Sequence, residues 1–342
     1  MIGLPPFLSF SENERTLQLK ILMIILRTVK NISSLNIAAS VLLFLAAILA
    51  AVVANSSLSP VYQDFLLQEL HLRIGNFNLF SHGGHPLKMI EFINDCLMTV
   101  FFLAVGLEIK RELLVGELSS VRKAALPFIA ACGGMVVPVV IYALSVASST
   151  PETRGMAIPM ATDIAFSLGV LSLLGKRVPL SLKIFLTAFA VVDDIGGILV
   201  IALFYSADVA YGYLIAAAVL YVFLYYMGKF GVTQKIFFLF FGVIIWYLFL
   251  QSGIHSTISG VILAFVIPAR PRLDAGKYIE RIRDIIGEFP VSKSDNIVLT
   301  NAQIATLKQV ERASDYVISP LQSLEDNLHG AVSFVILPLF AF

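Results

Sequence analysis

The sequence predicts an all-α polytopic membrane protein, and three observations carry that prediction. Of its 342 residues, 58% are hydrophobic and 14% are charged, whereas soluble domains have nearly half apolar and about a quarter charged residues. The mean hydropathy is +0.87, and the apolar residues gather in runs of helical length. This composition excludes disordered, collagen-like and small disulfide-stapled proteins, and it argues against a soluble enzyme. The net charge of +1 indicates no nucleic-acid partner.

The apolar runs give the expected spans in chain order. A bilayer core of about 30 Å requires about 20 apolar residues per helix. Eight runs approach this length: Ile37–Ala54, Phe92–Leu107, Ala125–Ala147, Met156–Leu174, Ile184–Phe204, Val209–Met227, Ile236–Leu250 and Gly253–Pro268. A ninth run begins near Gly330 and is still apolar at Phe342. The expected organisation is therefore an N-terminal segment at 1–35, an eight-span region at 36–268, a connection at 269–328 and the start of a ninth span at 329–342.

Lysines and arginines indicate the orientation of these spans, because cytoplasmic connections are enriched in both residue types. With the spans above, one side of the membrane has 21 of the 24 basic residues and the other side has three. This asymmetry predicts a cytoplasmic N-terminus. The apolar run Ile21–Leu26 is short and has no signal-peptide cleavage site after it, so we expect a helix lying on the cytoplasmic face.

The connection after the first span is expected to form a small β-hairpin on the outer face. Apolar and polar residues alternate over Leu70–Ile74, and Gly75-Asn76 can turn the chain into Phe77–Phe80. A hairpin edge can pair with a second copy of the chain, so a homodimer contact through residues 70–80 is one interpretation. A local loop without a partner is the other.

The longest connection, Ala269–Leu328, is charged and is expected in the cytoplasm, since eight of the basic residues lie in it. Ile279, Ile282 and Ile286 recur at helical spacing. This pattern predicts one short amphipathic helix within the connection.

The strongest functional signal lies in the fifth span, where Asp193 and Asp194 stand near the bilayer midplane. Charged side chains inside a bilayer are costly and indicate function by default. Adjacent residues of a helix point about 100° apart, so one carboxylate can face a cavity while the other meets a neighbouring helix. Two carboxylates this close repel each other, which favours the binding of protons or of a hard cation with oxygen ligands. The alternative is a pair neutralised by buried bases.

The fourth span adds Thr162 and Asp163 shortly after Pro159. Proline removes a helical donor and obstructs the preceding turn, so we expect a broken helix whose exposed backbone groups lie beside both residues. Discontinuous helices of this kind form ion sites in transporters. The alternative is an ordinary proline kink in which Asp163 caps the second half-helix.

Three further polar residues are candidates near the ends of spans. Asp95 either lines the cavity or pairs with another helix. Glu108 either guards a cytoplasmic funnel or joins an interfacial charge cluster with Lys110 and Arg111. His255, at the start of the eighth span, is either a hydrogen-bonded packing residue or a proton sensor.

Several stretches together carry a family resemblance: Asn94-Asp95, Phe101–Glu108, Ala157–Phe166, Leu182–Leu186, Asp193-Asp194, Ser252–His255 and Ile336–Phe342. With them, the chain resembles the NhaA family of sodium/proton antiporters over nearly its whole length from the first span onward. The resemblance implies an NhaA-like helical bundle in the bacterial inner membrane. It also implies electrogenic exchange of Na⁺ or Li⁺ for protons, serving pH and sodium homeostasis, with no cofactor.

The resemblance also implies roles for individual residues. Asp193 and Asp194 match the family's ion-binding pair, and Thr162 with Asp163 matches its unwound crossing. The hairpin at 70–80 matches the family's dimer contact.

Three more positions match family sites outside the ion-binding centre. Glu108 matches a cytoplasmic funnel acid. His255 and Glu325 match positions that are tied to the response to pH.

Two departures from the family pattern bear on these expectations. The connection Ala269–Leu328 is longer than in that pattern. The sequence also stops within the ninth of twelve spans, so the second inverted repeat, its broken helix and a tenth-span lysine are missing from it. We therefore expect the intact protein to be an antiporter and these 342 residues alone to be inactive.

The favoured mechanism is competition of Na⁺ and protons for Asp193 and Asp194 in a transporter, not an enzyme. An intramembrane aspartyl protease could use Asp163 and Asp193 from different helices around one water, but Asp194 would then have no role. A cation- or proton-coupled transporter of an organic solute would need half-helix N-termini facing an anionic substrate.

Overall fold

The computed structural model describes residues 38–146, 177–204, 209–270, 275–287 and 300–342, apart from 75–76, 79 and 83–84, together with isolated positions between 155 and 174. Within these residues the chain is mostly helical. The expected fourth span, Met156–Leu174, lies almost wholly outside the described residues, and the expected helix at Ile21–Leu26 lies outside them too.

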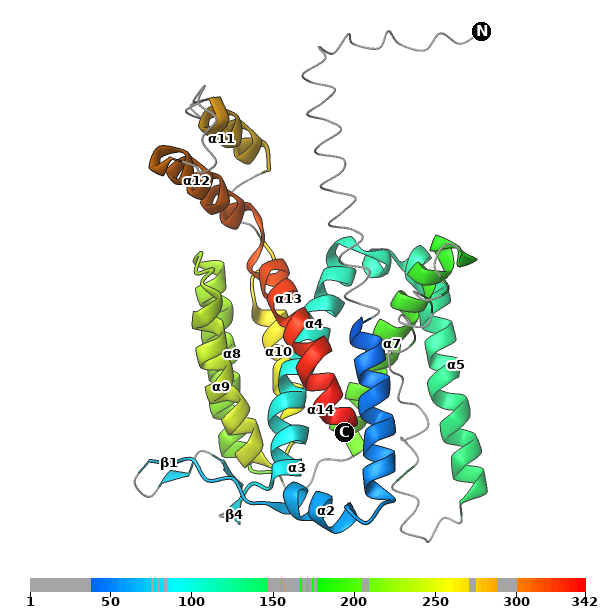
Figure 1. Ribbon diagram of the computed structural model, residues 1–342. Helices are drawn as coiled ribbons and strands as arrows, with labels where there is room; N and C mark the ends of the chain where they lie inside the picture. The colour runs from blue at the N-terminus through cyan, green and yellow to red at the C-terminus, as the bar shows by residue number, and fades with distance from the viewer. Residues whose placement is uncertain are drawn as a thin grey trace, which may run out of the picture.

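The first described helix, Ala38–Ala54, is followed by α2, Ser59–Leu67, after a bend of 111°. Pro60 stands in the first turn of α2, where its missing N–H removes no helical hydrogen bond. Figure 1 shows α2 lying across one end of the helix bundle.

Two small antiparallel hairpins follow α2. In the first, β1 (Arg73–Ile74) pairs with β2 (Phe77–Asn78), within the segment 70–80 where the sequence predicts a hairpin. In the second, β3 (Ser81–His82) pairs with β4 (His85–Pro86). The carboxamide of Gln251, at the end of helix α9, donates to the carbonyl oxygen of Ser81 at 2.6 Å and so ties the second hairpin to the bundle.

The remaining helices account for most of the described chain. In order they are α3 (Met89–Phe92), the π-helix η1 (Ile93–Leu97), α4 (Met98–Val115), the 3₁₀ turn η2 (Glu117–Ser119), α5 (Val121–Ser145), α7 (Leu180–Phe204), α8 (Tyr211–Lys229), α9 (Lys235–Ser252), α10 (Thr257–Val266), α11 (Ala275–Gly287), α12 (Asn301–Val317), α13 (Pro320–Ala331), the π-helix η6 (Val332–Ile336) and α14 (Leu337–Ala341). Where both can be compared, the helices overlap the apolar runs, although the helix Met89–Val115 extends eight residues beyond the run that ends at Leu107.

Four of the described helices are long and apolar enough to cross a membrane: the continuous helix Met89–Val115, α5, α8 and α9. The bent pair Ala38–Ala54 with α2 would be a fifth if it forms one span. The outer surface fits a lipid environment, since Leu126, Ile129 and Leu144 of α5 are 67%, 69% and 82% exposed. Large apolar surface of this kind is buried by lipid or by a partner in a stable protein.

The helices form three groups side by side (Figure 1). α8 and α9 pack together on one side of the bundle, and α5 packs with α7 on the other. α4, α10, α13 and α14 lie between these pairs, with α4 in contact with α10, α13 and α7. α4 is therefore the element that connects the two halves of the described bundle.

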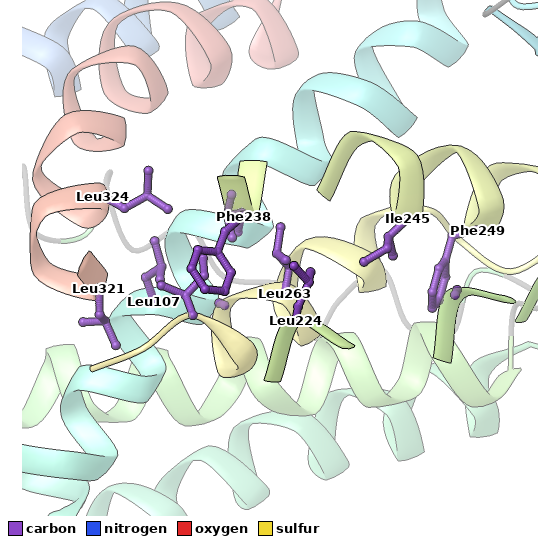
Figure 2. Close-up of a cluster of buried hydrophobic side chains, with 12 residues drawn as sticks. Leu107, Leu224, Phe238, Ile245, Phe249, Leu263, Leu321 and Leu324 are labelled. Atoms are coloured by element: carbon purple, nitrogen blue, oxygen red, sulfur yellow. The ribbon is translucent and has the colours of Figure 1, made fainter. Parts of the chain in front are cut away.

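The largest apolar core lies between α4, α8, α9, α10 and α13. Figure 2 shows Leu107, Leu224, Phe238, Leu263 and Leu321 gathered from these five helices. All five side chains are almost fully buried. Truncation of one such side chain typically costs about 2–5 kcal/mol, so this core fixes the relative positions of the five helices.

Glycines allow α4 and α10 to approach closely. A Cβ atom added at Gly260 of α10 would lie 2.4 Å from the carbonyl oxygen of Thr99 and 3.0 Å from the backbone nitrogen of Leu103. A Cβ added at Gly106 of α4 would lie 2.8 Å from the Cβ of Ala264. Small residues at membrane helix contacts permit this approach, which gains van der Waals contact where no hydrophobic force drives helices together.

Helix α13 begins before the apolar run of the expected ninth span. The apolar run begins near Gly330, but the helix begins ten residues earlier at Pro320, where Ser319 accepts a hydrogen bond from the backbone N–H of Gln322 at 3.2 Å. The first turns of α13 are polar, so hydropathy alone did not detect them. The π-helix η6 immediately precedes Pro338, whose ring would collide with the carbonyl group four residues earlier in a regular α-helix.

The connection 269–328 contains more helix than predicted. α11 covers the expected amphipathic helix, and α12 adds a second one that packs against it. The apolar positions Ile304, Leu307 and Val310 of α12 recur every third residue and drift around the helix, which explains why periodicity did not reveal α12.

Gly260→Ala should destabilise the protein, because the added methyl group would meet backbone atoms of α4 that cannot move independently. We expect a loss of about 1–3 kcal/mol in the free energy of unfolding in detergent. Gly133→Ala in α5 is the matched control, since a Cβ there meets nothing within 4 Å. That change should be neutral or slightly stabilising. Equal effects of the two substitutions would contradict the close contact of α4 with α10.

Candidate functional site

The aspartate pair, Asp193 and Asp194, lies near the middle of the 25-residue helix α7. The side chain of Asp193 is buried, with the residue 4% exposed, and Asp194 is half-buried. Their flanking residues Ala190, Val191 and Val192 are also buried. One buried and one half-buried aspartate thus lie inside an apolar helix, and their role in ion binding remains a prediction.

The two carboxylates belong to different faces of α7. Residues three or four apart share a helix face, so Asp193 lies on the face of Gly196 and Phe189. Those two residues approach α5, because a Cβ at Gly196 would meet the sulfur of Met135 and Phe189 lies near Gly134. The neighbouring carboxylate is therefore turned away from this face.

Asp194 shares its face with Val191, which contacts α4. Val191 packs with Val105 and Ile109 of α4 in a small buried cluster, and Ile195 lies against the same cluster. The pair thus straddles the region between α5 and α4, as expected for adjacent helical residues about 100° apart.

Neither carboxylate of the pair is without an interaction partner. Within the residues that the structure describes, no group of three or more His, Cys, Asp or Glu side chains gathers as a metal cage would. Thr162 and Asp163, the predicted complement of the pair, lie outside the described residues. Their participation therefore remains a prediction.

Asp95 forms a polar junction between α4 and its neighbours. It lies in the π-helix η1, and its carbonyl oxygen accepts a hydrogen bond from the indole N–H of Trp246 in α9 at 2.8 Å. The hydroxyl of Ser256, directly before α10, lies 3.0 Å from that carbonyl oxygen and 3.1 Å from Oδ1 of Asp95. The hydroxyl of Thr99 donates to the same carbonyl oxygen. Asp95 therefore contacts α9 and the residue directly before α10, and its role in lining a cavity remains a prediction.

Lys110 binds the opposite end of α10. Its ammonium group donates to the carbonyl oxygens of Phe265 at 2.7 Å and Ala264 at 3.3 Å, and also to that of Ile267. The last carbonyl groups of a helix have no partner within the helix, and the helix dipole places partial negative charge there. The ammonium group of Lys110 supplies hydrogen bonds to these carbonyl groups and a positive charge beside their partial negative charge.

A charge cluster at the end of α4 joins two distant parts of the chain. Arg111 Nε lies 3.0 Å from Oε1 of Glu325 in α13, 214 residues later, and Arg111 Nη1 lies 3.1 Å from Oε1 of Glu112. Glu108 lies within electrostatic reach of all three residues. We call these four residues, Glu108, Arg111, Glu112 and Glu325, the Arg111 cluster.

The Arg111 cluster combines two predicted site residues with Arg111, which was expected as a charge partner of Glu108, and with Glu112, which was not singled out. Glu108 and Glu325 were expected in separate roles, and the structure brings them to one place. Glu112 was missed, although its spacing of four from Glu108 puts it on the same helix face. Lys110 and Arg111 were considered only as partners of Glu108, whereas Lys110 instead binds α10.

His255 lies at the junction between α9 and α10 and is exposed. Its neighbour Ser256 is buried and carries the contact with Asp95. The role of His255 in a pH response remains a prediction.

Breaking the ion pair between α4 and α13 should weaken their contact. Glu325→Gln removes the carboxylate from a half-buried pair in which Arg111 is also held by Glu112, so we expect a loss of about 1 kcal/mol in the free energy of unfolding. Asp326→Asn, at the exposed neighbouring position, is the control and should cost less than half as much. A larger effect at Asp326 than at Glu325 would refute the assigned contact.

Residues 30–342 match the family described as Na⁺/H⁺ antiporter 1. The chain is 76% identical over 320 residues to the Na(+)/H(+) antiporter NhaA of Bacteroides thetaiotaomicron, and the match covers 94% of this chain and 73% of that protein. The NhaA protein of Bacteroides fragilis is 75% identical over 320 residues with the same coverage.

A more distant relative carries the same family name. The Na(+)/H(+) antiporter NhaA of Porphyromonas gingivalis is 47% identical over 322 residues, covering 93% of this chain and 71% of that protein. The family match extends over all the described spans, the aspartate pair and the Arg111 cluster, and on this evidence the chain belongs to the Na⁺/H⁺ antiporter 1 family.

Proposed function

We propose that the intact protein exchanges Na⁺ or Li⁺ for protons electrogenically across the bacterial inner membrane and so serves pH and sodium homeostasis. The observation that carries the proposal is the aspartate pair in the middle of α7, with Asp193 buried and Asp194 half-buried, within a chain 76% identical to a Na(+)/H(+) antiporter. Charged side chains inside an apolar membrane bundle are energetically costly, so such residues indicate a functional site.

The proposed mechanism is competition at one site. Carboxylate oxygens are suitable ligands for a hard cation, and the same oxygens bind protons. When the site opens to the cytoplasm, Na⁺ displaces protons from Asp193 and Asp194. After the loaded core reorients, Na⁺ leaves on the outer side and protons return. Two carboxylates can exchange more than one proton for each cation, which makes the cycle electrogenic.

The position of the pair between α5 and α4 supports this mechanism. Because Asp193 and Asp194 share faces with residues that contact different helices, a shift of α7 relative to either neighbour would change the surroundings of one carboxylate before the other. We propose that Thr162 and Asp163 complete the ion site from a broken fourth span, since half-helix ends supply oxygen ligands in transporters.

The Arg111 cluster is proposed as the cytoplasmic entrance. The proposed orientation, based on the Lys and Arg distribution, places the start of α5 and the end of α4 on the cytoplasmic side. There Glu108 would attract cations, and Glu325, bound to Arg111, would respond to pH together with His255 at the other end of α10. The Asp95 junction would then hold α10 on α4 near the outer side.

We propose a homodimer that forms through the hairpin at 70–80. Its strands are only two residues each and a two-stranded hairpin is marginally stable on its own, so pairing of its free edge with a second copy would extend the sheet.

The intramembrane protease is the second function that the sequence allowed, and it is less well supported. It assigns no role to Asp194, although Asp194 is half-buried beside its neighbour. A peptide-cleavage assay on the intact protein would distinguish the two functions.

Asp194→Asn in the full-length protein should abolish Na⁺-driven proton movement in reconstituted vesicles, because the site loses one of its two exchangeable carboxylates. Asp64→Asn is the matched control, since Asp64 is exposed on α2 at the end of the bundle. It should retain at least half of the wild-type rate. Normal transport by Asp194→Asn would exclude the pair as the ion site.

Replacing residues 73–78 by Gly-Ser-Gly should convert the intact protein from a dimer to a monomer, because it removes the free strand edge. Light scattering in detergent measures the change as a halving of the protein mass. The midpoint of thermal unfolding should stay within a few degrees of wild type, since β3 and β4 keep their own pairing. A variant that remains dimeric would reject the hairpin as the dimer contact.

A further inference from the structure

Helices α4, α10 and α13 are joined pairwise at one end of the bundle. Lys110 of α4 donates to the last carbonyl groups of α10. Directly after α10, the carbonyl oxygen of Pro268 accepts a hydrogen bond at 3.2 Å from the backbone N–H of Leu321, in the first turn of α13. Arg111 of α4 in turn binds Glu325 of α13. We call these five residues the three-helix junction; Figure 1 shows its helices together in the middle of the bundle.

Lys110 uses its full hydrogen-bonding capacity on α10. An ammonium group has three N–H donors and no acceptor, and the carbonyl oxygens of Ala264, Phe265 and Ile267 accept from it. Ala264 and Ile267 are shielded from water, at 0% and 1% exposed. Loss of the ammonium group would leave buried carbonyl groups without this donor, which is costly in an apolar bundle. The last turn of α10 would then rearrange.

Such a rearrangement of α10 would reach α13. Ile267 is bonded directly to Pro268, whose carbonyl oxygen binds Leu321. Leu321 and Glu325 are four residues apart, so they share one face of α13. Leu321 is 2% exposed within the largest apolar core, and a closely packed side chain moves together with its helix. A displacement of Pro268 would therefore also displace Glu325 from Arg111.

An open cavity lies beside the three-helix junction, on the side proposed to face the cytoplasm. It has a volume of about 360 Å³ and is lined by Arg111, Ile318, Gln322, Glu325 and Asp326. Two of these residues carry carboxylates. A cation that reaches the protein at this cavity would thus meet the side chain that the junction holds in place.

We propose that Lys110 is a positioning residue for the cytoplasmic entrance. It holds the end of α10, which fixes the start of α13 through Pro268 and so keeps Glu325 beside Arg111. Lys110 acts through these contacts and does not bind the transported ion. The proposal deepens the proposed function and rests on it, because that function assigns the Arg111 cluster to cation entry.

Position and charge make opposite predictions for Lys110. The Arg111 cluster has three carboxylates and one guanidinium group, so it is negative and attracts cations. If Lys110 acted only by its positive charge, its removal would lower the Na⁺ concentration required for transport. If Lys110 acts by position, its removal lets Glu325 move away, which disperses the negative charge and raises that concentration.

The first experiment measures the position of α13 in the intact protein in lipid nanodiscs. Its cysteines, Cys96 and Cys132 among them, are replaced by alanine. Spin labels are attached at Val115→Cys on α4 and Asn327→Cys on α13, two exposed positions, and electron spin resonance gives the distribution of distances between them. Lys110→Met should at least double the width of this distribution.

Two further variants serve as references for the distance measurement. Lys110→Arg keeps the charge but spreads its donors over a planar fork, so it should fold and should widen the distribution less than Lys110→Met. Lys229→Met removes an exposed positive charge from the last turn of α8. It should leave the wild-type distribution unchanged.

The second experiment measures Na⁺-driven proton movement by the unlabelled variants in vesicles. Lys110→Met should raise the Na⁺ concentration at half-maximal rate at least threefold. The maximal rate should stay within twofold of wild type, because the aspartate pair on α7 is untouched. Lys229→Met should change neither value. A loss of folded protein alone would lower the maximal rate without moving the half-saturating concentration.

Two outcomes would overturn the proposal. A wild-type distance distribution in both Lys110 variants would show that Lys110 does not position α13. An unchanged or lowered half-saturating Na⁺ concentration in Lys110→Met would leave Lys110 with no role beyond charge or folding. If the wild-type protein itself does not exchange Na⁺ for protons, the proposed function fails, and the spin labels still decide whether Lys110 positions α13.

Discussion

A bilayer offers no hydrogen bonds to a polypeptide, and the short helix α10 shows how the structure meets that constraint. Ten residues rise about 15 Å, roughly half of a bilayer core, so both ends of α10 would leave polar groups in a dry environment. The continuous helix Met89–Val115 contacts α10 at both ends: Asp95 of η1 accepts from the hydroxyl of Ser256, directly before α10, and Lys110 of α4 donates to the last carbonyl groups. Gly106 and Gly260 let the two helices approach closely enough for these contacts.

Because α4 holds α10, it also sets the positions of the other functional elements. One face of α4 contacts Val191 beside the aspartate pair, and its end carries Arg111, which binds Glu325 of α13. The α11–α12 pair precedes α13 in the chain and is joined to it by a two-residue link. In the proposed antiporter, an event at the cytoplasmic surface would thus reach the ion site through a single helix.

Much of this arrangement could be predicted from the sequence, but its cross-chain contacts could not. Hydropathy located the apolar runs, and the described helices overlap all of them except the fourth, which lies almost wholly outside the described residues. Two acidic residues inside an apolar run stand out in any hydropathy window, and this singled out Asp193 and Asp194. The pairing of Arg111 with Glu325 joins residues 214 apart, and no local pattern encodes it. Hydropathy detects helices only where they are apolar. It therefore missed the polar start of α13 and the helix α12, whose few apolar residues follow no helical period.

The central claim is that Na⁺ and protons compete for the aspartate pair, and the most direct test is the number of protons released when Na⁺ binds. Calorimetric titration of the purified intact protein with Na⁺, repeated in buffers of different ionisation enthalpy, gives that number. Competition at two coupled carboxylates predicts a release of about one to two protons per Na⁺, together with an affinity that falls as the pH is lowered. Na⁺ binding without proton release, at an affinity independent of pH, would contradict the mechanism.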